Sequence, residues 1–468
     1  MSLSTAEISA IAGSSSTAPE RSVHGYSIDS RTAQAGDLFF AIRGPRHDGH
    51  DFIGQAFERG AVAVVVDNTC SPPPLPYASS IIRVPDTTRA LQQLAREVRR
   101  RWGGPVIGIT GSTGKTTTKE MLAAVLETKF CVLKSRGNLN NQYGVPLTLL
   151  GLEPRHEVAV VEMGMSGPGE IALLADIAGP ETGIVTNVAP VHLQFFDSVD
   201  SIARAKRELI DRLQPPRAAI LNYDDERVRR FADGFEGQVV TFGFHPDANF
   251  QAVNVHAAHV FDQGSPAIGF ELRVGDHLEK FVIPLPGRHN VENALAAIAT
   301  AGLFGIAPQE ARAALAQFRP LDRRSGILKP PNGLILIDDA YNSNPRAMEQ
   351  MIEVLATWPN ARQRIVLAGE MLELGASSPE LHRRVGRLCA QAGADWLLAV
   401  QGDARAFLDG AVEAGMPHAH ALFFAGAMEA AKFCQTIAKP GDVILIKGSR
   451  GVGLEKAIEV LSADGPSA

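Results

Sequence analysis

The chain has 468 residues, which at roughly 150 residues per domain predicts about three domains. Hydrophobic residues make up 45% and charged residues 21% of it, a balance typical of a folded globular protein and not of a disordered one. Acidic residues outnumber basic ones by 51 to 45, and the formal net charge is -6. This charge disfavours a general nucleic-acid binder or a protein that lies on anionic membranes.

Membrane insertion and secretion find no support in the sequence. The longest purely aliphatic run, Ala61 to Val66, is far shorter than the ~20 residues of a membrane-spanning helix. The segment from Met1 to Gly13 lacks the basic and apolar regions of a secretory signal. No CxxC pair occurs among the cysteines, which are Cys70, Cys131, Cys389 and Cys434. We therefore expect a cytoplasmic protein without a disulfide framework or a zinc site.

Residues 1–102 are expected to form a first α/β domain. Short apolar runs predict strands at Asp37–Ile42, Ala61–Val66 and Ile81–Val84. A helix is predicted over Thr88–Trp102, because its apolar residues recur at helical spacing. The Gly-Gly-Pro sequence at 103–105 ends this helix and marks a domain boundary.

Residues 103–318 predict a central ATPase-like domain with a mostly parallel sheet. Strands alternate with helices, which is typical of such α/β domains. The stretch from 236 to 285 is polar and rich in turns, so we expect an antiparallel interruption there. The predicted strands are 105–109, 158–162 and 183–187, and the predicted helices are Thr117–Thr128 and Asn290–Ala301.

Residues 319–468 have the most regular pattern and predict a Rossmann-like, doubly wound sheet. The expected strands are 334–337, 365–368, 396–400, 422–424 and 443–446. Helical patterns lie between them, at Arg346–Leu355 and Pro379–Ala392 for example. Ligands of such sheets bind at the carboxyl ends of the strands.

The strongest local signal is a glycine-rich loop between the strand at 105–109 and the helix that follows it. Backbone N–H groups of such a loop surround phosphate oxygens, and the helix N-terminus adds its dipole. A lysine in the loop reaches the terminal phosphates, and a following threonine holds Mg²⁺. The loop residues predicted to bind the nucleotide are Gly111, Ser112, Thr113, Gly114, Lys115, Thr116 and Thr117.

This loop is a variant of the GxxxxGK[ST] pattern, because Ile109 stands where that pattern has its first glycine. The alternative is a glycine-rich turn with a solvated lysine. The strand before the loop and the helix after it favour a phosphate-binding site.

Other polar residues follow predicted strands, where this fold class places its chemistry. Glu162 ends one strand and could bind Mg²⁺, although a surface or capping glutamate is the simpler interpretation. His192 and Lys206, taken singly, are as well explained by a structural histidine and a solvated lysine. Asn290 and Asn293 lie one helical turn apart and can face one ligand together, or Asn290 can cap its helix. The segments 338–345 and 447–450 are polar and also follow strands, so we expect binding loops there.

Taken together, these motifs resemble the Mur ligases, ATP-dependent enzymes that build the peptide stem of bacterial peptidoglycan. The resemblance covers nearly the whole chain in the family's three-domain order. Within the family the chain resembles the MurF type, which adds D-alanyl-D-alanine. The discriminating stretches are Asp338–Pro345, Gly369–Gly375, Met163–Glu170 and Lys447–Arg450, and no Asp-Asn-Pro-Arg motif of the diaminopimelate-adding ligases occurs.

The resemblance implies a role for each matching residue. Ser30 and Arg31 correspond to the motif that binds the uridine end of the substrate. Thr116, Glu162, His192 and Lys206 correspond to residues that hold two Mg²⁺ ions, Lys206 being carbamylated in this family. Arg324, preceded here by arginine where the family has glycine, is expected near the γ-phosphate. Asn290 and Asn293 are expected near the adenosine, Asp339 and Tyr341 in the loop that closes over the nucleotide, and Asn344 at the dipeptide.

The implied reaction joins D-Ala-D-Ala to UDP-N-acetylmuramoyl-tripeptide through an acyl phosphate, with ATP and Mg²⁺ as cofactors, by a protein expected to act as a monomer. A ligase of the same superfamily with another amino-acid substrate, such as a folylpolyglutamate synthase-like enzyme, remains an alternative. A nucleotide-dependent binding or regulatory protein is a second alternative, which would need the phosphate loop but not the metal set. The sequence leaves open whether lysine or diaminopimelate is the third peptide residue, and which group deprotonates the amine.

Overall fold

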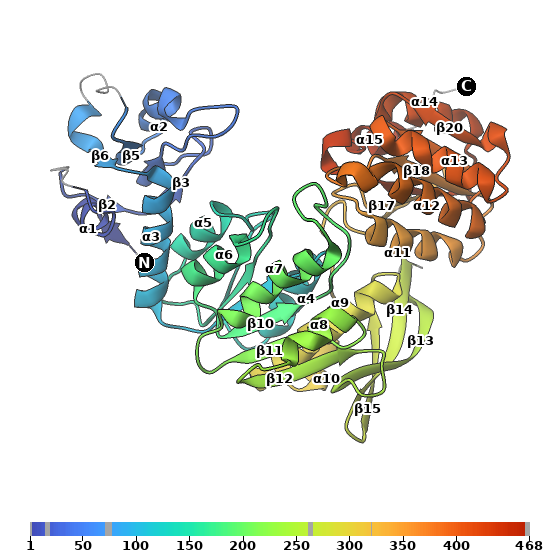
Figure 1. The fold of residues 1–468 in the computed structure, drawn as a ribbon, viewed down its shortest axis with the longest axis horizontal. Helices are drawn as coiled ribbons and strands as arrows, with labels where there is room; N and C mark the ends of the chain where they lie inside the picture. The colour runs from blue at the N-terminus through green and yellow to red at the C-terminus, as the bar shows by residue number, and fades with distance from the viewer. Residues whose placement is uncertain (1, 15–18, 71–76, 261–264, 320, 464–468) are drawn as a thin grey trace.

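The computed structural model describes the chain except for residues 1, 15–18, 71–76, 261–264, 320 and 464–468. Its described part forms three lobes in chain order, blue, green to yellow, and orange to red in Figure 1. The first and last lobes lie at opposite ends of the middle one. Each lobe contains its own mostly or wholly parallel sheet with helices around it, so the predicted α/β class is confirmed. No helix of the described part is both long and apolar enough to cross a lipid bilayer.

The first lobe contains a parallel sheet of four strands in the order β3–β4–β5–β6, beside the antiparallel pair β1 and β2. Helix α3 begins after Asp86, whose carboxylate accepts hydrogen bonds from two backbone N–H groups, and it ends at Gly103 in the left-handed conformation. The elements are β1 Leu3–Ser4, α1 Thr5–Ile11, β2 Ser22–Val23, β3 Gly25–Ser27, β4 Asp37–Phe40, α2 Ile53–Glu58, β5 Ala63–Asp67, β6 Ile81–Val84 and α3 Thr87–Trp102.

Helix α3 also attaches the first lobe to the middle lobe. Arg99, near its end, donates to the backbone oxygens of Ala178 and Gly179 and forms a 2.7 Å ion pair with Glu181. The indole of Trp102 donates to the backbone oxygen of His156 at 3.0 Å. These contacts fix the end of α3 on the middle lobe.

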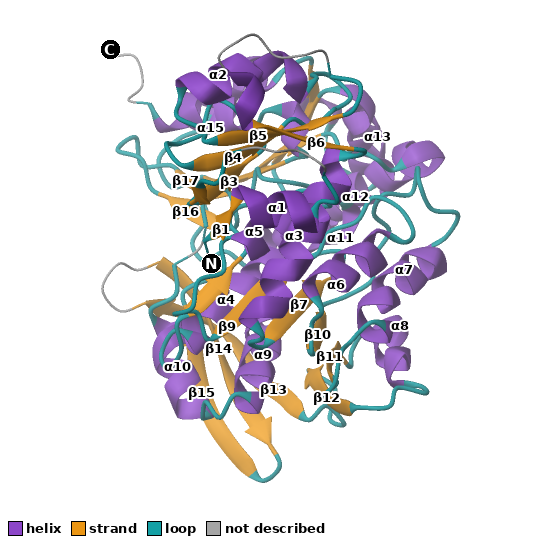
Figure 2. Cartoon of the chain, turned by 90° about the vertical axis from the view of Figure 1, so that its left-hand side faces the viewer, coloured by secondary structure: helices purple, strands orange, loops and turns teal. Residues whose placement is uncertain are grey.

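The middle lobe is built on a nine-stranded sheet in the order β15–β14–β13–β12–β11–β10–β7–β9–β8. Only the β13–β14 and β14–β15 pairs are antiparallel, and these strands extend away from the rest of the molecule at the bottom of Figure 2. The predicted antiparallel interruption therefore begins later than expected, because β12 pairs in parallel with β11. The strands are β7 Val106–Thr110, β8 Val132–Lys134, β9 Val158–Glu162, β10 Thr182–Val185, β11 Ala218–Asn222, β12 Gln238–Gly243, β13 Phe250–Val260, β14 Ser265–Val274 and β15 His277–Ile283.

Both faces of the parallel part are covered by helices. Alternate residues of a strand point to opposite faces, so Val106 packs in one core while Ile107 and Ile109 pack in the other. Helices α5, α6 and α7 contribute to the first core, and α4, α9 and α10 to the second. The helices are α4 Lys115–Leu126, α5 Gly144–Leu150, α6 Glu170–Ala178, α7 Val199–Asp211, α8 Glu226–Arg229, α9 Arg288–Leu303 and α10 Pro308–Ala316.

The last lobe has a six-stranded sheet in the order β16–β17–β21–β18–β19–β20. Its five parallel strands match the predicted ones within one residue at each end, while the antiparallel edge strand β16 was not predicted. The elements are β16 Gly326–Leu328, β17 Ile335–Asp338, α11 Pro345–Ala356, β18 Arg364–Gly369, α12 Ser378–Gln391, β19 Trp396–Val400, α13 Arg405–Glu413, β20 Ala421–Phe424, α14 Ala427–Ile437, β21 Val443–Lys447 and α15 Glu455–Ser462.

Candidate active site

The glycine-rich loop connects β7 to α4, and both of its glycines are required by close packing. Gly111 has φ 152° and Gly114 has φ 80°. A Cβ atom on Gly111 would lie 1.8 Å from Oγ1 of Thr186, and one on Gly114 would lie 2.3 Å from Oδ1 of Asn293. Helix α4 starts at Lys115, two residues earlier than predicted, because the left-handed Gly114 turns the chain directly into it.

Two residues that follow β10 hold this loop in shape. Oδ1 of Asn187 accepts from the backbone N–H of Thr113 at 3.0 Å, and the hydroxyl of Thr186 donates to the backbone oxygen of Thr113 at 2.6 Å. The sequence predicted that Thr186 and Asn187 continue a strand, but β10 ends at Val185. Their side chains are therefore free to bind the loop, a role that the apolar pattern of the strand could not reveal.

Thr116 and Glu162 come into direct contact at the end of β9. The Thr116 hydroxyl donates to Oε2 of Glu162 at 2.8 Å, and the side-chain amide of Asn140 donates to Oε1 at 2.8 Å. Glu162 is 2% exposed, and the ammonium of Lys119 lies 3.8 Å from Oε2. The carboxylate thus faces the phosphate loop with neutral donors on both oxygens.

Lys115 lies close to this carboxylate and to a second lysine, Lys206. Lys115 donates to the backbone oxygen of Gly111 at 2.7 Å, and burial lowers its pKa although Glu162 opposes that shift. Lys206, on α7, is 2% exposed, and among the described residues none accepts a hydrogen bond or ion pair from its ammonium group. Burial, and next the charge of Lys115, lower the pKa of Lys206 far below its usual value.

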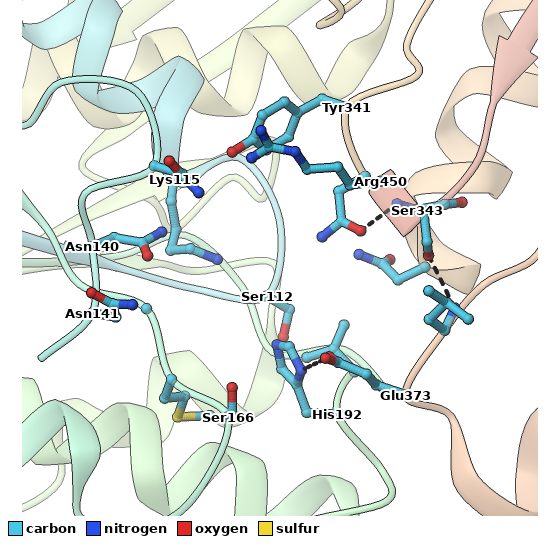
Figure 3. Close-up of a pocket in the computed structure, with 18 of the residues that line it drawn as sticks. Ser112, Lys115, Asn140, Asn141, Ser166, His192, Tyr341, Ser343, Glu373 and Arg450 are labelled. Carbon is cyan, nitrogen blue, oxygen red and sulfur yellow. Dashed lines mark hydrogen bonds and ion pairs between the residues drawn. The ribbon is translucent and has the colours of Figure 1, made fainter. Parts of the chain in front are cut away.

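His192 lies in the segment between β10 and α7, and it contacts the last lobe. Its Nδ1 is 2.5 Å from Oε2 of Glu373. Figure 3 shows its ring between Glu373 and Ser112 of the phosphate loop. Of the predicted metal ligands, Thr116 and Glu162 are therefore in direct contact with each other. Lys206 lies near Lys115, and His192 contacts Glu373.

The asparagines at the start of α9 connect that helix to the phosphate loop. The Asn290 amide donates to the backbone oxygen of Pro286 at 2.7 Å, and Asn293 accepts from the hydroxyl of Thr118 at 3.2 Å. The amide of Asn293 also donates to Oδ1 of Asn290 at 3.2 Å. Beside them, burial lowers the pKa of His289 to about 4. The structure therefore places both predicted asparagines against the loop, with their side chains in mutual contact.

The loop after β17 brings the predicted residues of the last lobe to the same place. Asp339 accepts from the backbone N–H of Ser325 at 2.8 Å and forms an ion pair with Lys447. The guanidinium of Arg324 lies over the ring of Tyr341, 4.1 Å from its centroid. Arg324 is therefore held beside the predicted nucleotide loop of the last lobe.

Asn344 has a structural role that the sequence did not predict. Its Oδ1 accepts from the backbone N–H of Ala347 at 3.0 Å and caps α11, with Pro345 in the first turn. The same residue lines the cavities described next, so its amide nitrogen remains available to a ligand.

Two adjoining cavities lie between the middle and last lobes. One, of about 180 Å³, is bounded by the phosphate loop, α9 and the segment 339–344. The other, of about 460 Å³, is drawn in Figure 3 and is bounded by Asn138–Asn141, His192, Glu373 and Arg450. Ser112, Lys115 and Tyr341 line both cavities, so their common wall contains the phosphate-loop lysine.

A third cavity, of about 710 Å³, lies in the first lobe and contains Ser30 and Arg31 in its lining. Ser30 donates to Oε1 of Gln55 at 2.5 Å, and Arg31 forms an exposed ion pair with Asp29. Tyr143, from the middle lobe, also lines this cavity. The predicted uridine site is therefore separate from the phosphate loop and bordered by both lobes.

Several lining residues were given no role by the sequence. Asn140 and Tyr143 belong to one asparagine-rich segment that touches all three cavities, and that composition was a usable signal. Glu373 lay in a stretch that suggested the family and Lys447 in a predicted binding loop, but nothing in the sequence indicated their partners. The first pairs with a histidine 181 residues away and the second with an aspartate 108 residues away.

Comparison with known families gives a consistent result over the three lobes. Residues 22–99 match the family described as Mur ligase family, catalytic domain, and residues 109–301 match the Mur ligase middle domain. Residues 323–450 match the Mur ligase, glutamate ligase domain.

Individual proteins agree with this result. The UDP-N-acetylmuramoyl-tripeptide--D-alanyl-D-alanine ligase of Bacillus subtilis is 36% identical over 94% of this chain and 93% of its own length. The crystal structure of MurF from Acinetobacter baumannii superposes with a TM-score of 0.88 and 30% identity, covering 99% of both chains. MurF ligase from Thermotoga maritima, in complex with ADP, superposes with a TM-score of 0.80 and 28% identity over 94% of this chain and 97% of that one.

Proposed function

The chain belongs to the Mur ligase family, and we propose that it uses ATP to join D-alanyl-D-alanine to UDP-N-acetylmuramoyl-tripeptide. The product is the UDP-linked pentapeptide precursor of peptidoglycan. The observation that carries this proposal is the position of Lys115 on the wall shared by the two interlobe cavities. A phosphoryl group held in one cavity can there meet a carboxylate held in the other.

ATP occupies the smaller cavity in this proposal. The backbone N–H groups of Gly111–Thr117 and the N-terminus of α4 face its phosphates, and Lys115 supplies a positive charge at their end. Asn290 and Asn293 lie at the other side of the loop and approach the adenosine. Asp339 and Tyr341 cover the nucleotide from the last lobe.

The residues beside the loop fit Mg²⁺. Thr116 and Glu162 already form an oxygen pair at the phosphate loop, and a hydroxyl and a carboxylate are ligands that Mg²⁺ prefers. We propose that His192 and a carbamylated Lys206 complete the set. Lys206 suits this modification because its lowered pKa favours the neutral amine that reacts with CO₂, and the carbamate places an anion near the charge of Lys115. When bound, Mg²⁺ neutralises negative charge on the phosphates.

The reaction then follows from charge placement. A peptide carboxylate oxygen attacks the γ-phosphorus, the bond to the β-phosphate oxygen breaks, and ADP leaves an acyl phosphate behind. Lys115 and Arg324 offset the charge that develops on the transferred group. The free amine of D-Ala-D-Ala attacks the acyl carbon, the C–O bond to phosphate breaks, and the amine loses a proton as the amide forms.

The three cavities divide the substrates among the lobes. Ser30 and Arg31 bind the uridine end in the first lobe, and the peptide end extends toward the 460 Å³ cavity. The dipeptide enters that cavity from the side of the last lobe, near Asn344. Docking of the last lobe brings the two peptides and ATP together, so its motion gates the reaction.

The test is release of inorganic phosphate from ATP and Mg²⁺ with each substrate omitted in turn. We expect release only when UDP-N-acetylmuramoyl-tripeptide and D-Ala-D-Ala are both present, with a pentapeptide product by mass spectrometry. Phosphate release that does not depend on the dipeptide would contradict the proposed ligation. Preparing the tripeptide with lysine and with diaminopimelate identifies the third residue.

A further inference from the structure

The contact between His192 and Glu373 joins two lobes through a residue that the proposed function places at a metal ion. His192 belongs to the middle lobe and Glu373 to the segment after β18 in the last lobe. The 2.5 Å separation of Nδ1 and Oε2 occupies one ring nitrogen and leaves Nε2 on the opposite edge of the ring. That edge is available to the phosphate-loop side of the cavity (Figure 3).

Both residues are held in unusual backbone conformations. His192 has φ 55° and Glu373 has φ 64°, in the left-handed region that side chains other than glycine rarely adopt. Such conformations persist where the surrounding structure fixes them, and they concentrate at functional sites. The two segments also bind each other through the backbone, since Gln194 N–H donates to the oxygen of Glu373 at 3.3 Å.

A carboxylate that binds the second nitrogen of a histidine has a recognised effect at metal sites. It fixes the tautomer and the orientation of the ring and raises the basicity of the nitrogen that binds the metal. Here the carboxylate belongs to the last lobe and the histidine to the middle lobe.

We propose that Glu373 is a positioning residue that orients His192 for the metal only when the last lobe is docked on the middle lobe. This inference rests on the proposed role of His192 as a metal ligand. It goes further because it assigns Glu373 a function and makes assembly of that site depend on closure. With the lobes apart His192 loses its partner and its ring rotates freely, so the site binds metal weakly until the last lobe arrives.

The test measures the binding of Mn²⁺, used in place of Mg²⁺, to the full-length enzyme. A non-hydrolysable ATP analogue and bicarbonate buffer are present. Electron paramagnetic resonance reports the Mn²⁺ affinity and, in its pulsed form, the coupling of Mn²⁺ to a histidine nitrogen. We expect Glu373→Ala to weaken the histidine-linked Mn²⁺ site by about 10- to 100-fold, as is usual for such partners, while nucleotide affinity is unchanged. Glu373→Gln, which keeps an acceptor oxygen of the same reach, should recover part of the loss.

A disulfide separates orientation of the ring from docking of the lobes. A Cβ atom on Gly375 would lie 3.4 Å from Cβ of Gln194, close to the separation in disulfides. Gln194→Cys with Gly375→Cys therefore locks the lobes in this arrangement, and each single cysteine variant is its control. With Glu373 intact the locked protein should keep the Mn²⁺ site. In the locked protein that also carries Glu373→Ala, Mn²⁺ binding should remain weak, because docking alone does not orient the His192 ring.

Three results would overturn the proposal. The first is an unchanged Mn²⁺ affinity in Glu373→Ala. The second is tighter Mn²⁺ binding in that variant, which would make Glu373 a competitor of the metal. The third is full recovery of Mn²⁺ affinity in Glu373→Ala by the disulfide, which would make Glu373 a docking contact only. The His192→Ala variant tests the assumption that His192 binds the metal. If it retains the histidine-coupled signal, the proposed metal role of His192 fails and this inference fails with it, whereas the ligation is tested separately by phosphate release.

Discussion

The hydroxyl of Thr116 donates a 2.8 Å hydrogen bond to Oε2 of Glu162, and it joins the first turn of α4 to the end of β9. These residues are 46 positions apart in the sequence. Because β7 and β9 are parallel neighbours, their carboxyl ends meet at the same edge of the sheet. The contact therefore places a hydroxyl and a carboxylate oxygen together next to the phosphate loop, where we propose that Mg²⁺ binds.

Replacement of Thr116 by valine tests that position. Valine has nearly the same shape but lacks the hydroxyl, so we expect the Mg²⁺ concentration for half-maximal phosphate release to rise by about 10- to 100-fold. Thr116→Ser keeps the oxygen and should stay near the wild-type value. If the valine variant and the wild type need the same Mg²⁺ concentration, the Thr116 hydroxyl does not bind the metal.

Lys115→Ala should abolish ligation without unfolding the protein. Lys115 makes a single hydrogen bond to its own loop, whereas removing its charge from the transferring phosphoryl group should cost at least about 10²- to 10³-fold in turnover. Phosphate release and a thermal melt are the measurements. Lys129→Ala, at the surface ion pair with Glu310, is the matched control and should turn over normally. Normal turnover by Lys115→Ala, or its global unfolding, would refute the assignment.

Lys206 should make stability depend on pH in a predictable direction. Its folded pKa lies below the ordinary value of 10.5, so the native state binds fewer protons than the unfolded state between those two values. The free energy of unfolding should therefore rise with pH in that window and fall as pH drops through the folded pKa. Urea unfolding in CO₂-free buffer at pH 7 and pH 9 measures the slope, and Lys206→Met should flatten it. Parallel pH profiles would contradict the burial argument.

The same residue provides a functional test of carbamylation. Lys206→Ala should lower turnover by at least about 100-fold, the upper range for loss of a group that supports a metal site. Added short carboxylic acids such as acetate should restore part of the activity by replacing the carbamate. Rescue by neutral molecules of the same size would point to cavity filling instead.

Arg450 is expected to bind the carboxylate of the incoming dipeptide. Its guanidinium lines the 460 Å³ cavity and lies 5.6 Å from the Tyr341 ring centroid, and no acid of the described residues pairs with it. Because charge-assisted hydrogen bonds contribute about 1.5–3 kcal/mol, Arg450→Ala should raise KM for D-Ala-D-Ala by roughly 10- to 100-fold and leave KM for ATP unchanged. When D-Ala-D-Ala is replaced by its C-terminal amide, the KM of the wild type should rise by the same factor. The KM of Arg450→Ala should not rise further with that amide. A further loss in the variant would place the carboxylate elsewhere.

Asn344 can be divided into its two roles by matched variants. Asn344→Asp keeps the oxygen that caps α11, whereas Asn344→Ala removes it and should cost about 1 kcal/mol of stability. If the amide nitrogen contacts the dipeptide, both variants should raise KM for D-Ala-D-Ala. If Asn344→Asp has the wild-type KM, Asn344 serves the helix alone.

The sequence by itself determined the α/β class, the five parallel strands of the last lobe and the phosphate loop. Buried strands of a parallel sheet are continuous apolar runs, and a glycine-rich loop between a strand and a helix is a local pattern, so neighbouring residues suffice to reveal both. The resemblance to the Mur ligases likewise rested on short segments whose residues are contiguous.

Only the tertiary structure decided which side chains meet. The parallel pairing of β12 depends on the strand beside it, and the ends of β10 and α4 depend on contacts at Asn187 and Gly114. Glu373 reaches His192, and Lys447 reaches Asp339, across more than a hundred residues. Such partners are set by how the lobes fold and dock. A local sequence pattern indicates whether a residue is buried. It does not indicate which distant group the side chain of that residue contacts.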